Sequence, residues 1–188
     1  MADRPTSLIA RLRQVAPEPP ADLAAALRAA SRQARTLLEL TETHEPPVEP
    51  AILLVDPKVE IVYSSGLGQA SGACRWSGHR YLIAVNGREP APRQRFTTFH
   101  EFKHALDGAE TTAVIARFSR PGKRPAPEFV ADYFAACVLM PDDWVARAAR
   151  HARDLAHLAD YFGVSSEAMR VRIETQVGAG RHLIGTKS

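Results

Sequence analysis

The sequence of 188 residues predicts an α+β fold, in which a small antiparallel sheet packs beside helices. Short apolar runs separated by turn residues gather between residues 51 and 86, and such runs are typical of β-hairpins. Longer stretches with apolar residues at helical spacing lie before and after this region. A chain of this length is expected to form one domain with a sizeable core.

The first 45 residues are predicted to form an N-terminal helical segment. A short helix is expected from Thr6 to Val15, and a longer one after the prolines at 19 and 20. The longer helix is indicated by an amphipathic stripe made of Leu23, Leu27, Ala30, Ala34 and Leu37. The segment HEPPVEP, residues 44–50, ends this helix and indicates a linker. We therefore expect an N-terminal segment over 1–45 and the main domain over 46–188, within one compact unit.

Two β-hairpins are predicted after the linker. The first would pair AILLV (51–55) with EIVY (60–63), since DPK between them is a turn sequence. The second would pair ACRW (73–76) with RYLIAV (80–85) around the turn SGH. Helices are expected from there to the end of the chain.

Residues 100–104 read HEFKH, an HExxH pentad in a segment whose phenylalanines recur at helical spacing. Residues four apart on a helix share a face, so His100 and His104 can direct imidazole nitrogens at one metal ion. Glu101 is adjacent to His100, where its carboxylate can act as general base on a metal-bound water without being a ligand. The alternative is an ordinary pair of surface histidines.

A catalytic zinc site usually has three protein ligands, so a third ligand is required. Glu128 and Asp132 share a helical face in PEFVADYFAACVLMP (127–141), which is otherwise nearly all apolar. We assign Glu128 as the third ligand and Asp132 as the acceptor for a ring N–H of His100. The alternatives are a helix N-terminal carboxylate at Glu128, favoured by the helix dipole, and a salt bridge to arginine at Asp132.

Three blocks together resemble the ImmA/IrrE family of metallo-endopeptidases. They read RQRFTTFHEFKHALDG, EFVADYFAACVLMP and LADYFGVSSEAMRVRIE, in the order found in that family. The resemblance implies a zincin-like fold and a zinc-dependent, gluzincin-like protease, often encoded beside a helix-turn-helix repressor that it cleaves. The family's ligands fall on His100, His104 and Glu128, and its catalytic glutamate on Glu101.

The chain departs from the family pattern inside the pentad. Members usually read HELGH, whereas this chain has Phe102 and Lys103, so no ligand is lost but packing or access beside the site can change. The resemblance also implies that RYLIAV is an edge strand that holds an extended substrate by backbone hydrogen bonds. The alternative is an ordinary core strand.

Composition fits a cytoplasmic protein that does not enter membranes. No apolar run is long enough to span a bilayer, and the first residues lack the apolar core of a signal peptide. Cys74 and Cys137 lack CxxC spacing, which indicates reduced, structural thiols. The net charge of +3 allows nucleic acid as a partner without implying it. The densest basic stretch, residues 116–127, contains proline and glycine and predicts a loop between the two metal-ligand helices.

The rival function is DNA binding through the C-terminal region. LAHLADYFGVSSEAMRVRIET has the pattern of a helix-turn-helix, in which Ser165 or Ser166 could cap the second helix. DNA contact would require exposed Arg170 and Arg172, yet glutamates flank both. A third possibility is a catalytically idle metal-binding sensor.

The function expected from the sequence is zinc-dependent hydrolysis of a peptide bond in a protein substrate, a helix-turn-helix transcriptional repressor. DNA binding is the alternative, and no contact with membranes is expected. The residue that stabilises the oxyanion is not identified by the sequence, and Tyr133, His151 and His157 are candidates.

Overall fold

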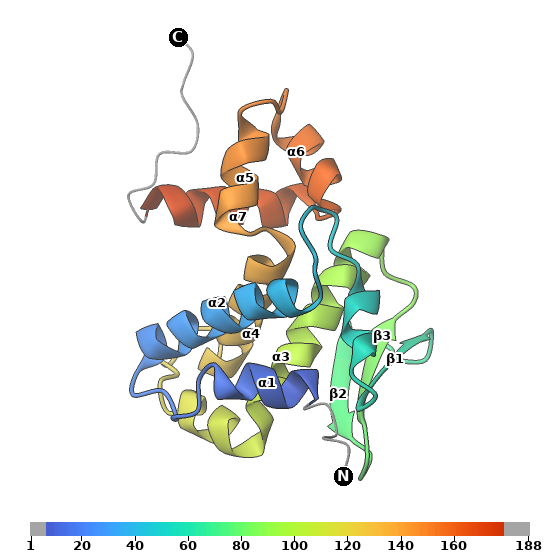
Figure 1. Ribbon diagram of the computed structural model, residues 1–188, viewed down its shortest axis with the longest axis vertical. Coiled ribbons are helices and arrows are strands. Elements are labelled where there is room, and N and C mark those ends of the chain that lie inside the picture. Colours follow the sequence, from blue (N-terminus) through green and yellow to red (C-terminus); the bar gives the residue numbers. More distant parts are fainter. Residues whose placement is uncertain (1–6, 179–188) are drawn as a thin grey trace.

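A computed structural model describes residues 7–178, and within this range the fold is α+β as predicted (Figure 1). Helices precede and follow a small sheet, and a second group of helices lies at one end of the molecule (Figure 1). In chain order the elements are α1 (Leu8–Gln14), α2 (Leu23–Leu40), η1 (Pro50–Val55), β1 (Val59–Ser64), β2 (Gly72–Trp76), β3 (Tyr81–Asn86), α3 (Ala91–Ala116), α4 (Ala126–Leu139), α5 (Asp142–Ala149), α6 (Leu155–Phe162) and α7 (Ser166–Gly178).

The sheet is mixed, which corrects the expectation of an antiparallel one. Its strand order within residues 7–178 is β1-β3-β2. The second hairpin is confirmed, because β2 pairs antiparallel with β3. However, β1 runs parallel to β3. The RYLIAV segment is therefore the central strand, and the prediction that it is a sheet edge is wrong; β2 is the edge strand that packs against α3.

The first predicted hairpin is also wrong, because residues 50–55 form the 3₁₀ helix η1. Pro50 stands at its start, where proline's fixed φ suits a helical turn. Pro50, Leu53 and Asp56 are buried, whereas Leu54 and Val55 are exposed, so burial recurs every third residue. That period matches a 3₁₀ helix rather than the alternation of a strand.

The N-terminal helices pack into the same core as the rest of the chain. Both expected helices are present, although Thr6 lies outside the described residues. α2 packs against α4. Arg13 at the end of α1 donates from Nε to Leu106 O (2.9 Å) and from Nη2 to Ala105 O (2.9 Å). Both carbonyls lie just before the kink in α3 at Gly108, which has a φ of 60°.

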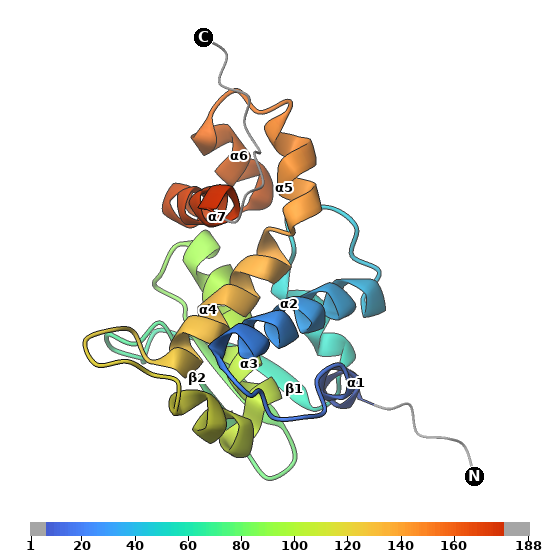
Figure 2. The same cartoon turned by 90° about the vertical axis from the view of Figure 1, so that its left-hand side faces the viewer.

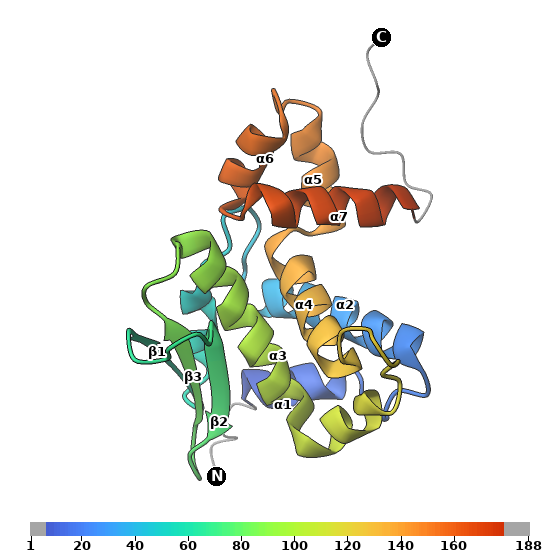
Figure 3. The same ribbon diagram turned by 180° about the vertical axis from the view of Figure 1, so that it is seen from behind.

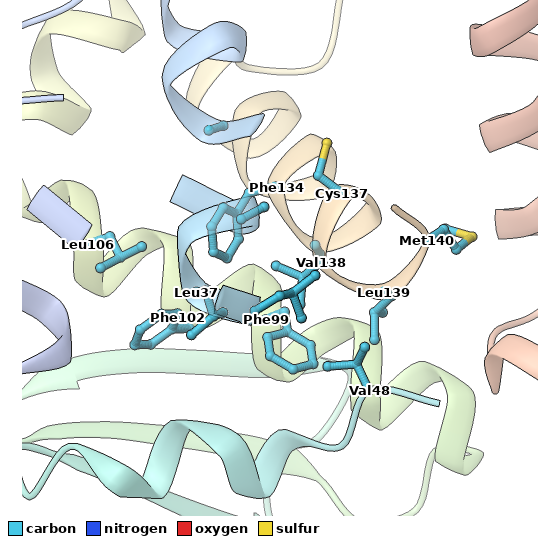
Figure 4. Packing of buried hydrophobic residues seen from close by; sticks show 14 of the residues in the cluster. Leu37, Val48, Phe99, Phe102, Leu106, Phe134, Cys137, Val138, Leu139 and Met140 are labelled. Atoms are coloured by element: carbon cyan, nitrogen blue, oxygen red, sulfur yellow. The ribbon is translucent and has the colours of Figure 1, made fainter. Parts of the chain in front are cut away.

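The core lies between α3, α4 and α2, and its largest side chains are aromatic (Figure 4). Phe99, Phe102 and Phe134 are fully buried, and Leu37 of α2 joins them. Phe99 and Phe102 flank the pentad's first histidine and occupy the core face of α3, so the histidines must face away from it. The family usually has leucine where this chain has Phe102. The larger ring is accommodated because it is buried in the core beside Phe134.

The C-terminal helices form the predicted helix, glycine turn and helix. Gly163 ends α6 in the left-handed conformation, with a φ of 62°. Ser165 caps α7, because its Oγ accepts from Ala168 N at 3.1 Å. Arg172 joins this unit to the end of α4, since its Nε donates to Met140 O at 3.0 Å. Figure 2 shows α5, α6 and α7 grouped together above α4.

Among residues 7–178, no helix combines the length and the hydropathy that crossing a membrane requires.

Candidate metal centre

The structure brings His100, His104 and Glu128 together from two helices. One ligand atom from each of the three lies within 4.8 Å of the others. The Nε2 atoms of the two histidines are 3.2 Å apart. Glu128 Oε2 is 3.3 Å from His100 Nε2, and Glu128 Oε1 is 3.4 Å from His104 Nε2. The α3–α4 packing therefore places the carboxylate directly opposite the pentad.

These distances fit a tetrahedral zinc ion. Zinc binds nitrogen and oxygen ligands at about 2.0–2.2 Å, so two ligands of one tetrahedral ion are about 3.4 Å apart. The three observed separations lie within about 0.2 Å of that value. Two neutral imidazoles and one carboxylate are also a donor set that catalytic zinc sites use. The residues present are therefore able to hold zinc.

Asp132 fixes the orientation of the His100 ring. His100 Nδ1 donates to Asp132 Oδ1 at 2.8 Å, which leaves Nε2 directed towards Glu128. Arg124, from the loop before α4, holds the other oxygen of Asp132, with Nε 3.0 Å from Oδ2. Both roles considered for Asp132, a partner for histidine and a salt bridge with arginine, are thus present at once.

The electrostatics of the site favour a neutral His104. Burial lowers the pKa of His104, and the neighbouring His100 lowers it further. A metal ligand must be the neutral imidazole, so this shift favours the ligating form. For Glu101, burial raises the pKa of the carboxyl group, His100 lowers it and Glu128 raises it. A half-buried carboxylate with a raised pKa accepts a proton more readily than an ordinary carboxylate, as a general base requires.

Glu101 lies where the edge strand β2 approaches α3. A Cβ on Gly72 would be 2.5 Å from Thr97 Cγ2 and 3.0 Å from Glu101 Cγ. It would also be 3.0 Å from the Ala84 carbonyl oxygen. Only glycine allows the strand to lie this close to the helix. The start of β2 and the Glu101 carboxylate are therefore held side by side.

A cleft of about 740 Å³ runs past the site. Its floor is formed by α3 and α4, which contribute His100, Glu101, Glu128 and Asp132. Residues at the start of β2 line one side, and residues of α7 line the other. Figure 3 shows α7 extended above α3 and α4, with the sheet beside α3. The cleft therefore runs between β2 and α7, past the three converging side chains.

Two of the three candidates for the oxyanion donor lie elsewhere. His151 and His157 line a different cavity, together with Trp144 and Tyr161. Tyr133 lines the cleft. Burial raises the pKa of its hydroxyl, and Cys137 beside it raises that pKa further, so the hydroxyl stays protonated and able to donate.

Both cysteines are free thiols, as expected. Cys137 is buried, and burial raises the pKa of Cys74 to about 12. Neither thiol is therefore a thiolate at neutral pH, which agrees with a structural role.

Sequence reasoning missed Gly72, Arg124 and the contribution of α7 to the cleft. In the sequence, Arg124 was noticed only as one residue of the basic stretch 116–127. That stretch does contain the loop between α3 and α4, as predicted. Its position four residues before Glu128 was the one available signal, because that spacing lets it reach the carboxylates of α4. Gly72 carried no signal, because its role depends on a contact between a strand and a distant helix.

A small sheet, an HExxH helix and an opposing carboxylate on a second helix define the zincin-like class of metallopeptidase folds. The chain belongs to the family described as the IrrE N-terminal-like domain, Peptidase M78, whose model matches residues 56–174. The resemblance to the ImmA/IrrE family is therefore confirmed, and so is the zincin-like α+β fold.

Two similar proteins carry names that refer to regulation. A propionyl-CoA carboxylase regulator of Cereibacter sphaeroides is 35% identical over 97 residues, which are 50% of this chain and 21% of that protein. The chain thus spans about a fifth of the length of that relative. A solved transcriptional regulator of Mycobacterium tuberculosis superposes with a TM-score of 0.60 at 21% identity, over 77% of this chain and 46% of that one. The second likeness concerns the fold alone.

Replacing Glu128 by alanine is expected to lower zinc occupancy while leaving the fold intact. The change removes one of three converging donors, and the Glu128 side chain is 41% exposed, so little packing is lost. Elemental analysis of purified protein should give close to one zinc per chain for the wild type and much less for Glu128→Ala. Unchanged zinc in the variant would move the third ligand elsewhere, with Asp132 the next candidate.

Proposed function

We propose that the protein is a zinc-dependent endopeptidase that cuts a protein substrate, a helix-turn-helix transcriptional repressor. One observation carries the proposal: the converging nitrogens and carboxylate of His100, His104 and Glu128 have the half-buried Glu101 beside them in an open cleft. A site that only stores metal needs neither a cleft nor an adjacent carboxylate that is not a ligand. Membership of a peptidase family supports the same conclusion.

Each residue has a separate task in this proposal. His100, His104 and Glu128 hold the zinc ion, which when bound supplies Lewis-acid chemistry at the scissile carbonyl and at a water molecule. Glu101 accepts a proton from the attacking water on its carboxylate and donates it to the leaving amine. Asp132 keeps the His100 ring in place through Nδ1.

The edge of β2 is the proposed binding site for the substrate backbone. β2 pairs with β3 on one side, so its other edge has backbone groups available for an added strand. Gly72 places the start of this edge beside Glu101. An exposed, extended segment of a protein is the substrate that fits such an edge. We place the reaction in the cytoplasm, where a repressor acts, and assign it to residues 46–188 with 1–45 as a supporting helical segment.

DNA binding by α7 is the weaker alternative. Arg170 on the exposed surface of α7 is held by Glu167 and Glu174, with contacts of 2.6 Å to both. Arg172 is buried and pairs with Asp142. Neither arginine is thus available to a phosphate without losing a carboxylate partner.

Cleavage of a helix-turn-helix repressor, sought first among the neighbouring genes, is the expected result that tests the proposal. Incubation with that repressor and zinc should yield discrete fragments by mass spectrometry, because the enzyme cuts at one exposed segment. The chelated protein is the control and should leave the repressor intact. An intact repressor together with a salt-dependent shift of its operator DNA would favour DNA binding, and zinc binding with neither effect would favour an idle sensor.

A further inference from the structure

The half of the cleft nearest α7 is lined mostly by apolar side chains, and the proposed hydrolysis does not use it. Two of its large side chains are exposed, Phe129 at 43% and Val171 at 47%. Exposed apolar groups that line one concave surface are typical of a binding site. The apolar residues that line this half include Phe96, Phe129, Ala136, Val164, Ala168 and Val171.

This apolar half begins at the proposed metal ligands. Phe96 is one helical turn before His100 on α3, so both lie on the face of α3 that borders the cleft. Phe129 follows Glu128 directly on α4. A substrate with its scissile bond at the metal therefore has a neighbouring side chain within reach of these two rings.

α7 supplies the opposite wall. Ala168, Val171 and Thr175 recur at spacings of three and four, so they share one helical face, and all three line the cleft. Met169 on another face of α7 is fully buried and anchors the helix. Figure 3 shows α7 passing over the ends of α3 and α4. One face of α7, the second helix of the helix-turn-helix-like unit, therefore borders the proposed active site.

The charged residues on the α7 side are already paired. Glu167 binds Arg170, and Arg172 pairs with Asp142. A charged substrate side chain would therefore compete with existing ion pairs, whereas an apolar one would cover exposed apolar surface.

We propose that the α7 side of the cleft selects a large apolar substrate residue, such as leucine or phenylalanine, next to the scissile bond. Phe129 and Val171 are the specificity-determining residues. The proposal rests on the proposed peptidase function, because it takes His100, His104 and Glu128 as the site of reaction.

Binding of two hydroxamates tests the proposal without requiring cleavage. A hydroxamate chelates zinc, and the two compounds differ only in an isobutyl or a methyl side chain beside the chelating group. Calorimetry on the zinc-loaded protein should show at least about tenfold tighter binding of the isobutyl compound, the lower end of what burial of a leucine side chain supports. Val171→Asp and Phe129→Ser should reduce this ratio to about threefold or less.

Val62→Asp is the matched control, because Val62 is 38% exposed on β1, outside the cleft. This variant should keep the tenfold ratio. Equal affinities for the two hydroxamates in the wild type, or an unchanged ratio in both cleft variants, would overturn the proposal. Circular dichroism of each variant establishes that the fold is retained.

A peptide library separates this proposal from the peptidase function. Cut peptides should be enriched in leucine, isoleucine, phenylalanine or methionine on one side of the bond. Cleavage without such enrichment would contradict the apolar preference and leave the peptidase function standing. A hydroxamate preference without cleavage of any peptide would support the apolar site and contradict the peptidase function.

Discussion

Glu101→Gln is expected to lower substrate cleavage by at least about a hundredfold, the low end for loss of a general base. Glutamine keeps the size and hydrogen-bonding shape of the side chain but cannot accept the proton. Zinc content should stay near the wild-type value, because the converging donors come from His100, His104 and Glu128. Thermal stability should not fall, since burial disfavours the charged carboxylate and glutamine carries no charge.

Three measurements on Glu101→Gln test this prediction: the rate of cleavage, the zinc content by elemental analysis and the melting temperature. Glu110→Gln is the matched control, because Glu110 is exposed on the same helix and lies outside the cleft. The inactive variant should still bind its substrate and retain it in pull-down experiments. A wild-type cleavage rate in Glu101→Gln would refute the assignment of the general base, whatever its zinc content.

Lys103→Met is expected to destabilise the protein by about 3 kcal/mol, the lower end for removing one partner of a buried ion pair. Lys103 and Asp107 pair on α3, and their side chains are only 3% and 6% exposed. Burial lowers the pKa of Lys103, while the Asp107 carboxylate raises it. Methionine matches the lysine stem but leaves Asp107 without its cation. The cost stays near the lower end because Asp107 also borders a cavity of about 510 Å³ that water can enter.

Urea unfolding measures this loss, and a double variant identifies its cause. Adding Asp107→Leu to Lys103→Met should recover most of the stability, because an apolar pair leaves no buried charge unpaired. Lys58→Met is the control and should change the free energy of unfolding by less than about 0.5 kcal/mol, since Lys58 is exposed. Equal stability of the wild type and Lys103→Met would show that this pair contributes nothing to the fold.

The same ion pair explains why this chain has lysine at position 103, where the family usually has glycine. The sequence showed this difference but not its reason. Lysine in place of the usual glycine suggested altered access to the site, yet Lys103 is directed away from the cleft and is neutralised by Asp107. Four residues separate the two, so the spacing for an ion pair on one helical face was present in the sequence. The sequence did not show that this face of α3 is buried, because its burial depends on helices that are distant in the chain.

The sequence alone predicted the helices, the second hairpin, the loop between α3 and α4 and the family. Helical periodicity and the HExxH spacing are local, and a residue four positions away on a helix has a fixed direction. The HExxH spacing was therefore sufficient to predict His100 and His104 as the proposed ligands. Glu128 needed the further argument that a carboxylate in an apolar helix requires a partner.

Only the tertiary structure decided the strand order, the 3₁₀ helix at 50–55 and the walls of the cleft. A short apolar run fits either a strand or a helix, and its neighbours in space make the choice. Strand order depends on pairing between segments far apart in sequence, which is why β2 rather than β3 became the sheet edge. The approach of Gly72 to Glu101 and the position of Val171 above the cleft likewise arise from packing between elements, and no local pattern encodes such packing.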